Sequence, residues 1–255
     1  EEAKSLYVDQ SALAERLQLP AGKSPEEVPE LVIWDVGLGA AANAMAAVQC
    51  YEAAAAQGPV RRLKLISFEN DLDSLRLALT HKSYFPYLRH SGPDAVLARG
   101  QWTSRQFPGL SWELLEGDFW ERAPQASAKP DLVFYDFFSH KTDTACWKLA
   151  SFARLFELVR SERSAELFTY SASTAVRAGL LHAGFFVGAG VGTGVKKDTT
   201  VALTSGWAGA PRHALLGAEW LGKWDRSQAK FPDGLTEPER VAFEDKIRRH
   251  PQFAG

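Results

Sequence analysis

Residues 31–51, LVIWDVGLGAAANAMAAVQCY, constrain the fold more than any other stretch of the chain. The opening run LVIW is apolar and rich in strand-forming residues, which is typical of a buried parallel strand. Asp35, Gly37 and Gly39 then form a tight turn, and the alanine-rich segment after them favours a helix. A strand, a glycine turn and a helix open a nucleotide-binding α/β unit, in which a ligand approaches the backbone at the helix N-terminus. Ala42 occupies the place of the third glycine in the dinucleotide fingerprint, and the alternative is that the turn serves only to reverse the chain.

The rest of the chain alternates between apolar runs and helical segments. Strands are expected at 63–69, 111–115, 131–136 and 165–171, with a closing pair at 185–188 and 199–204. An extended piece is expected at 6–8, and helices are expected near 11–17, 72–79, 143–159, 174–183 and 237–250. This alternation predicts an α/β fold with a mostly parallel sheet covered by helices on both faces. We expect an N-terminal extension at 1–30, the main domain at 31–205 and a helical C-terminal appendage at 206–255, where the composition changes.

The composition limits the class of protein. The chain has 255 residues, 45% hydrophobic and 24% charged, which suffices for one substantial core. The net charge of −2 does not indicate a nucleic-acid binder, although composition cannot exclude a local basic face. No apolar run approaches the roughly 18 residues of a membrane span, and no secretory signal opens the chain. Cys50 and Cys146 lack metal-ligand spacing and are typical of reduced thiols, so we expect a cytoplasmic protein without a metal site.

Acidic residues follow several of the expected strands. Ligands of parallel sheets bind at the carboxyl ends of the strands, where the strand order reverses. Glu69 there could accept hydrogen bonds from both ribose hydroxyls of a nucleoside, or be a solvated strand-end carboxylate. Asp118 and Phe119 could present a carboxylate and an aromatic face to a purine, or form a simple turn. Asp35 could hold a ligand ammonium group, or cap the following helix.

Asp136 ends an apolar strand, where an unpaired carboxylate is costly. A carboxylate in this position can bind a cationic amine or help to remove its proton. The structural alternatives are a helix cap or a salt bridge to Lys141 or Arg177. Trp147 is close enough in the sequence to stack on a base.

Three segments resemble the MnmC/MnmD family of tRNA (5-methylaminomethyl-2-thiouridine) methyltransferases. They are ISFENDLDSLRLALTH (66–81), TYSASTAVRAGLLHAGF (169–185) and GVGTGVKKD (190–198). The glycine turn, the pair Gly117-Asp118 and the spacing of Asp136, Phe138 and Trp147 match the family in order, and the similarity extends over roughly residues 5 to 205.

The resemblance implies a class I, Rossmann-like methyltransferase fold, with a seven-stranded sheet whose last strand is antiparallel, and S-adenosyl-L-methionine as cofactor. It places the methionine part at Asp35, Gly37 and Gly39, the ribose at Glu69 and Asn70, and the adenine at Asp118 and Phe119. Asp136 then faces the aminomethyl nitrogen of the tRNA wobble uridine. The substrate-binding candidates that the resemblance adds, for the tRNA anticodon stem-loop, are Phe138, Lys141, Trp147, Arg177, Lys196 and Lys197.

The loop after Asp136 departs from the family, because it lacks the prolines that the family carries there. Lys196-Lys197-Asp198 replaces the usual Lys-Arg-Glu, and no flavin-binding half accompanies the domain, so we expect a standalone form. A methyltransferase with another amine acceptor is therefore an alternative. A non-catalytic module that binds the cofactor or RNA is another. A nicotinamide-dependent oxidoreductase is disfavoured by the missing third glycine.

Overall fold

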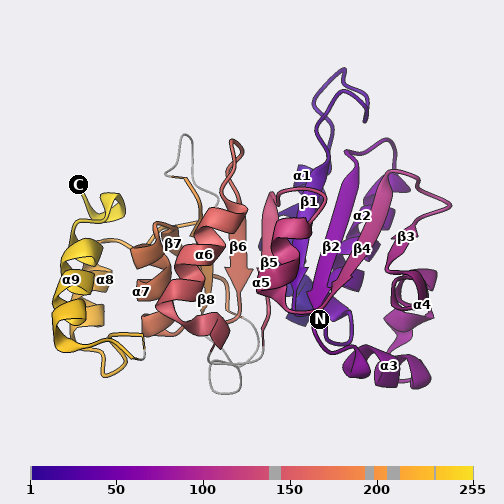
Figure 1. The fold of residues 1–255 in the computed structure, drawn as a ribbon. Helices are drawn as coiled ribbons and strands as arrows, with labels where there is room; N and C mark the ends of the chain where they lie inside the picture. The colour runs from indigo at the N-terminus through magenta and orange to yellow at the C-terminus, as the bar shows by residue number, and fades with distance from the viewer. Residues whose placement is uncertain (1, 138–144, 193–197, 206–212, 233, 255) are drawn as a thin grey trace. The chain divides into compact units, whose positions relative to one another are not determined.

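The computed structural model describes residues 2–137, 145–192, 198–205, 213–232 and 234–254. The chain divides into two compact units, an N-terminal unit of residues 1–136 and a C-terminal unit of residues 137–255. Each unit contains its own strands and helices (Figure 1).

The N-terminal unit is built on a mostly parallel set of strands. The strands are β1 (Leu31–Val36), β2 (Leu63–Glu69), β3 (Gln101–Thr103), β4 (Leu110–Glu116) and β5 (Leu132–Tyr135). They lie in the order β3-β4-β2-β1-β5, and only the β3–β4 pair is antiparallel. Since β2 and β4 continue the sheet on one side of β1 and β5 lies on the other, the strand order reverses at β1.

Helices cover both faces of these strands, with α5 in front of them and α2 behind them in Figure 1. The helical segments of this unit are η1 (Lys4–Asp9), α1 (Leu13–Arg16), α2 (Ala42–Ala55), α3 (Asp73–Thr80), η2 (Pro86–Arg89), α4 (Ser91–Arg99), α5 (Phe119–Arg122) and η3 (Ala123–Gln125). Every residue of β1 is buried, as expected of a parallel strand that is covered on both faces.

One local prediction in this unit is wrong. Residues 6–8 were expected to be extended, but they lie in the π-helical segment η1. Leu6, Tyr7 and Val8 are all buried there, and the ring of Tyr7 lies 5.0 Å from that of Phe134. Three consecutive apolar residues do not distinguish a strand from a buried helical turn, so only the packing decides.

The described residues contain eight strands, one more than the sequence analysis expected. The additional strand is β3, which pairs with the outer side of β4. Gly100, with a φ of 72°, ends α4 and turns the chain directly into β3. Only three residues form β3, and Trp102 alone is buried, so the sequence carries almost no periodic signal for it.

The C-terminal unit contains an antiparallel set of strands. The strands are β6 (Glu166–Thr169), β7 (Phe186–Gly190) and β8 (Thr199–Leu203), and β8 pairs with both of the others. The pairing of β7 with β8 confirms the expected closing pair. The helical segments are η4 (Ala145–Trp147), α6 (Leu149–Val159), α7 (Thr174–Ala183), α8 (Ala218–Asp225), α9 (Glu237–Arg248) and η5 (Pro251–Phe253).

The helices of the tail pack within the C-terminal unit through aromatic side chains. Phe243 of α9 stacks on His182 of α7, with ring centroids 4.8 Å apart and ring planes inclined by 7°. Trp224 of α8 is fully buried. The domain boundaries expected from the sequence, 1–30, 31–205 and 206–255, stay a prediction.

Candidate functional site

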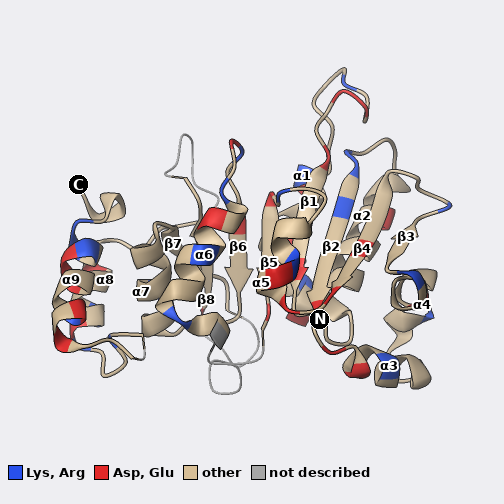
Figure 2. Ribbon diagram, viewed as in Figure 1, with Lys and Arg blue, Asp and Glu red and all other residues tan. Residues whose placement is uncertain are grey.

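Acidic residues meet where the parallel strands of the N-terminal unit end. Glu69 is the last residue of β2, and it lies in register with Glu116, the last residue of β4. Figure 2 shows both strand ends in red. Asp136 follows β5 directly, and its N–H donates to the carbonyl of Val36 at the end of β1 (2.9 Å). This edge, at the point where the strand order reverses, is where open α/β sheets bind their ligands.

The glycine turn between β1 and α2 lies at the centre of this edge. Gly37 has a φ of 91° and Gly39 a φ of 51°, in the left-handed region that favours glycine. The N–H of Gly37 donates to the carbonyl of Phe68 (3.0 Å), which ties the turn to β2. A Cβ atom on Gly39 would meet no atom within 4 Å, so the turn borders open space there. A ligand can therefore approach the backbone beside the N-terminus of α2.

Glu69 holds the glycine turn in place. Its carboxylate is buried and accepts hydrogen bonds from the N–H groups of Gly39 (2.9 Å), Asn70 (2.9 Å) and Asp71 (3.1 Å). The side chain of Asn70 is exposed beside it. Glu69 thus couples the end of β2 to the turn after β1, at the position that the sequence analysis assigned to ribose binding.

Asp35 is fully buried in β1. Its Oδ2 accepts a hydrogen bond from the hydroxyl of Ser67 (2.8 Å), which in turn accepts one from the indole N–H of Trp112 (2.9 Å). Its Oδ1 has no hydrogen-bond partner. The pKa of Asp35 is raised from 3.8 to about 7, chiefly by burial and also by the nearby charges of Asp136 and Glu69, against the lowering effect of the Ser67 hydrogen bond. A cation placed beside such a carboxyl would stabilise its ionised form.

Asp136 is oriented by Asn43, a residue that the sequence analysis missed. The side-chain amide of Asn43 donates to Oδ2 of Asp136 at 2.7 Å. Asn43 lies in the first turn of α2 and is buried. The sequence did offer one signal for a special role of this residue: asparagine is a poor helix former, and here it lies within an alanine-rich helix. Asn43 brings the glycine-turn helix and the strand-end acid into one site.

Asp118 and Phe119 do more than form a simple turn, because Asp118 caps a helix and Phe119 packs in the core. Oδ1 of Asp118 caps α5 by accepting from the N–H groups of Trp120 (2.8 Å) and Glu121 (3.2 Å). The ring of Phe119 is buried and packs edge-on against Phe68, at 5.1 Å. The expectation that this ring offers a free face to a purine is therefore corrected, because the ring belongs to the core. Asp118 itself is exposed at the site edge.

Among the expected substrate-binding residues, Trp147 and Arg177 lie within the described residues, both in the C-terminal unit. Trp147 is buried, and its ring lies edge-on to Phe152 and Tyr170, beside a cavity of about 640 Å³. Phe138, Lys141, Lys196 and Lys197 lie outside the described residues.

The expectation for Arg177 is corrected. Its side chain is 3% exposed, and its guanidinium donates to Asp198 Oδ2 (2.9 Å), to the carbonyl of Thr199 (2.7 Å) and to Thr200 Oγ1 (3.0 Å). A guanidinium that is buried in these bonds ties α7 to β8 and cannot reach a phosphate without breaking them.

The described residues contain no group of three or more His, Cys, Asp or Glu side chains that could hold a metal ion. In the same residues, no helix has the length and apolar character needed to cross a membrane. Cys50 and Cys146 are not joined in a disulfide.

Comparison with known proteins identifies related chains. The model of a family described as S-adenosyl-L-methionine-dependent methyltransferase matches residues 98–205. The bifunctional protein MnmC of Chromobacterium violaceum, named for tRNA 5-methylaminomethyl-2-thiouridine biosynthesis, is 29% identical over 239 residues, which are 88% of this chain and 33% of that protein. MnmC of Pseudomonas aeruginosa is 30% identical over 234 residues, again 33% of that protein. This chain therefore spans about a third of the length of these curated relatives.

A solved structure has the same fold. MNMC2 from Aquifex aeolicus superposes with a TM-score of 0.63 at 22% identity, over 97% of this chain and 74% of that one. The expected α/β methyltransferase fold is confirmed. Over residues 98–205 the chain is thus similar to S-adenosyl-L-methionine-dependent methyltransferases, and over most of its length it is similar to the MnmC proteins, as the sequence resemblance implied.

Proposed function

We propose that this protein transfers the methyl group of S-adenosyl-L-methionine to the 5-aminomethyl group of the wobble (2-thio)uridine of tRNA. The observation that carries the proposal is the hydrogen-bonded pair of Asn43 and Asp136 beside the glycine turn. This pair supports the proposal because it orients a carboxylate, a group suited to an amine, at the sheet edge that we assign to the cofactor. The names of the MnmC relatives supply the class of substrate.

The residues of the N-terminal unit fit the cofactor. Gly37 and Gly39 form an open turn for the methionine part, and the carboxyl of Asp35, with Oδ1 unpartnered, suits the electrostatics of its ammonium group. We assign the ribose to Glu69 and Asn70, and the edge of the adenine to Asp118. The buried ring of Phe119, the next residue, supports this part of the site from the core.

The cofactor, when bound, supplies a methyl group on a positively charged sulfur. Asp35, Glu69 and Asp136 share one edge of the sheet; the charges of Glu69 and Asp136, and that of Asp35 when it ionises, favour both the cationic cofactor and a cationic amine. Their main contribution is to hold the donor and the acceptor in line.

Asp136 acts on the acceptor amine. The nitrogen attacks through its lone pair, so the aminomethyl group must first lose the proton that it carries at neutral pH. The carboxylate of Asp136 accepts a hydrogen bond from this nitrogen and receives or relays the proton. The new N–C bond then forms as the C–S bond breaks, which leaves a neutral thioether. Asn43 fixes the direction of the carboxylate during this sequence.

The tRNA contacts are assigned to the anticodon stem-loop. Lys196 and Lys197, which follow the glycine-rich segment 188–194, supply cations for the phosphates, as does Lys141. Phe138 and Trp147 supply aromatic rings for a base.

The test is transfer of labelled methyl groups to tRNA from cells that lack this activity, so that the wobble uridine carries a free aminomethyl group. We expect label in that nucleoside with the parent protein and loss of label with Asp136→Ala. Asp94→Ala is the matched control, because Asp94 is an exposed carboxylate paired with Lys82 (2.6 Å) and should leave transfer unchanged. If Asp136→Ala transfers methyl groups at the parent rate, the proposed active site is refuted. If the parent binds the cofactor but labels no tRNA, the acceptor is another amine.

A further inference from the structure

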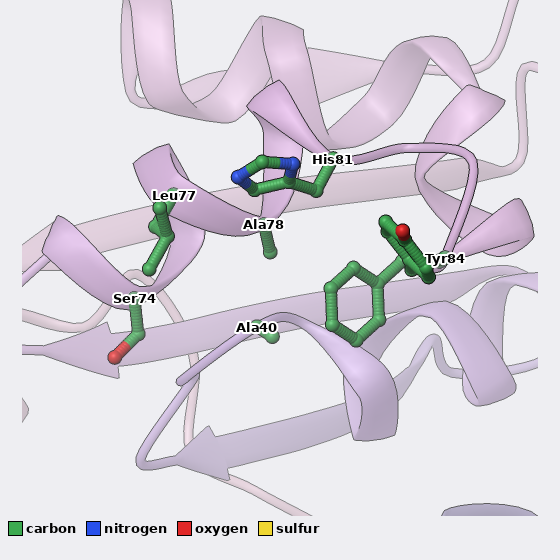
Figure 3. Close-up of a pocket in the computed structure, with 7 residues that line it drawn as sticks. Ala40, Ser74, Leu77, Ala78, His81 and Tyr84 are labelled. Atoms are coloured by element: carbon green, nitrogen blue, oxygen red, sulfur yellow. The ribbon is translucent and has the colours of Figure 1, made fainter.

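A cavity of about 570 Å³ adjoins the glycine turn in the N-terminal unit (Figure 3). Ala40 of the turn forms one wall, and Ser74, Leu77 and Ala78 of α3 form another. The loop after α3 closes the cavity with the rings of His81, Tyr84 and Phe85. The volume is in the range of small-ligand pockets, and the walls are mostly apolar or aromatic with few polar groups.

Two large apolar side chains at the rim of this cavity are unusually exposed to solvent. Leu77 is 63% exposed and Tyr84 80% exposed. They are two of the four exposed large hydrophobic residues in the described part of the chain. Both side chains also line the cavity, and exposed apolar groups that gather at a cavity suit a binding site better than ones scattered singly over the surface.

The polar groups of the cavity are available to a ligand. Neither the hydroxyl of Ser74 nor the ring nitrogens of His81 have a hydrogen-bond partner among the described residues. The ring of His81 instead lies edge-on to Tyr84, with centroids 6.3 Å apart. Flat rings with a few edge groups suit a planar heterocycle better than an aliphatic chain, because the heterocycle both stacks and forms hydrogen bonds.

The position of the cavity ties it to the reaction. The hydroxyl of Tyr87 donates to the carbonyl of Ala40 (3.1 Å), so the loop behind the cavity is anchored to the glycine turn. Arg89, at the end of the same loop, is exposed and makes no ion pair with any described residue, and it can meet a phosphate. An RNA that presents its acceptor nucleotide at the turn would bring a neighbouring nucleotide to this loop.

We propose that this cavity binds an unpaired nucleobase of the RNA substrate, next to the nucleotide that is methylated, by stacking it on Tyr84. The inference rests on the proposed function and deepens it by naming a second RNA contact in the N-terminal unit. Anticodon-loop bases suit this site because they are unpaired and can be splayed onto aromatic side chains.

The first experiment is ultraviolet crosslinking of an anticodon stem-loop that carries 5-bromouridine beside the wobble position. Trypsin cleaves after Lys82 and Arg89 and releases the peptide SYFPYLR, residues 83–89, which contains Tyr84, Phe85 and Tyr87. We expect the crosslink in this peptide. A crosslink confined to other peptides would overturn the inference.

The second experiment measures steady-state methyl transfer by Tyr84→Ala and Tyr84→Phe. Loss of one stacking contact should raise KM for tRNA about tenfold in Tyr84→Ala. The Phe variant keeps the ring and should behave as the parent, with kcat and the cofactor Kd unchanged in both variants. Val241→Ala is the matched control, since Val241 is 65% exposed on α9.

The outcomes separate this inference from the proposed function. If the parent methylates tRNA but Tyr84→Ala leaves KM unchanged, the base site is refuted and the proposed function remains. If Tyr84→Ala weakens cofactor binding and leaves KM for tRNA unchanged, the cavity binds the cofactor and the inference is again refuted. If the parent crosslinks at residues 83–89 but transfers no methyl group, the base site is supported and the proposed function fails.

Discussion

Replacing Asp35 by asparagine should change how the stability of the protein depends on pH. Asp35 is fully buried, and its carboxyl is held by Ser67 (2.8 Å). Asparagine has nearly the same shape and can keep the contact with Ser67, but it cannot ionise. The variant therefore removes one titration and leaves the packing of β1 largely intact.

The magnitude follows from the pKa of Asp35, which burial raises from 3.8 to about 7. Between these values the folded protein binds one more proton than the unfolded chain, so the free energy of unfolding falls as the pH rises through this window. The full shift of roughly 3 pKa units corresponds to about 4 kcal/mol. From pH 5 to pH 8, only about 2 of these units are crossed, so the parent should lose about 2.5 kcal/mol relative to Asp35→Asn.

Urea unfolding at several pH values between 5 and 8 measures this difference. The curve of Asp35→Asn should be flatter than that of the parent, and the two should diverge progressively as the pH rises. Asp73→Asn serves as the control, because the Asp73 side chain is 80% exposed on α3, and its curve should follow the parent. Parallel curves for the parent and Asp35→Asn would show that Asp35 is ionised throughout, and would refute the reasoning.

Three further substitutions test the site and the C-terminal unit. Asn43→Ala should lower kcat for methyl transfer about tenfold or more with the cofactor Kd unchanged, because it removes the 2.7 Å bond that orients Asp136; an unchanged kcat in steady-state kinetics would count against this role. Glu69→Ala should weaken cofactor binding by about 1–3 kcal/mol by calorimetry, since it also releases the N–H of Gly39; an unchanged Kd would contradict the ribose assignment. Arg177→Ala should lower the free energy of unfolding by about 2–3 kcal/mol and leave KM for tRNA unchanged, because its buried guanidinium has structural partners; a raised KM at parental stability would restore a role in RNA binding.

The sequence by itself determined the order and the location of most elements. Apolar runs such as LVIW and LKLISFE are local signals, and they lie in β1 and β2 as expected. The glycine turn was also predictable, because the positive φ of Gly37 and Gly39 reflects a local steric preference. The short edge strand β3 and the segment η1 were missed, since their few residues carry no clear periodicity.

Only the tertiary structure decided what each polar or aromatic side chain contacts. Asn43 and Asp136 are 93 positions apart, and they meet because α2 starts beside the carboxyl end of β5. Arg177 is held by hydrogen bonds to Asp198 and to Thr199, at the start of β8. The sequence of α7 alone does not indicate these partners. The partners of such groups depend on strand order and on burial, which are properties of the whole chain. Sequence patterns reflect local preferences, and these were enough to predict the edge of the sheet where the site lies. Which side chains complete the site depends on the folded chain as a whole.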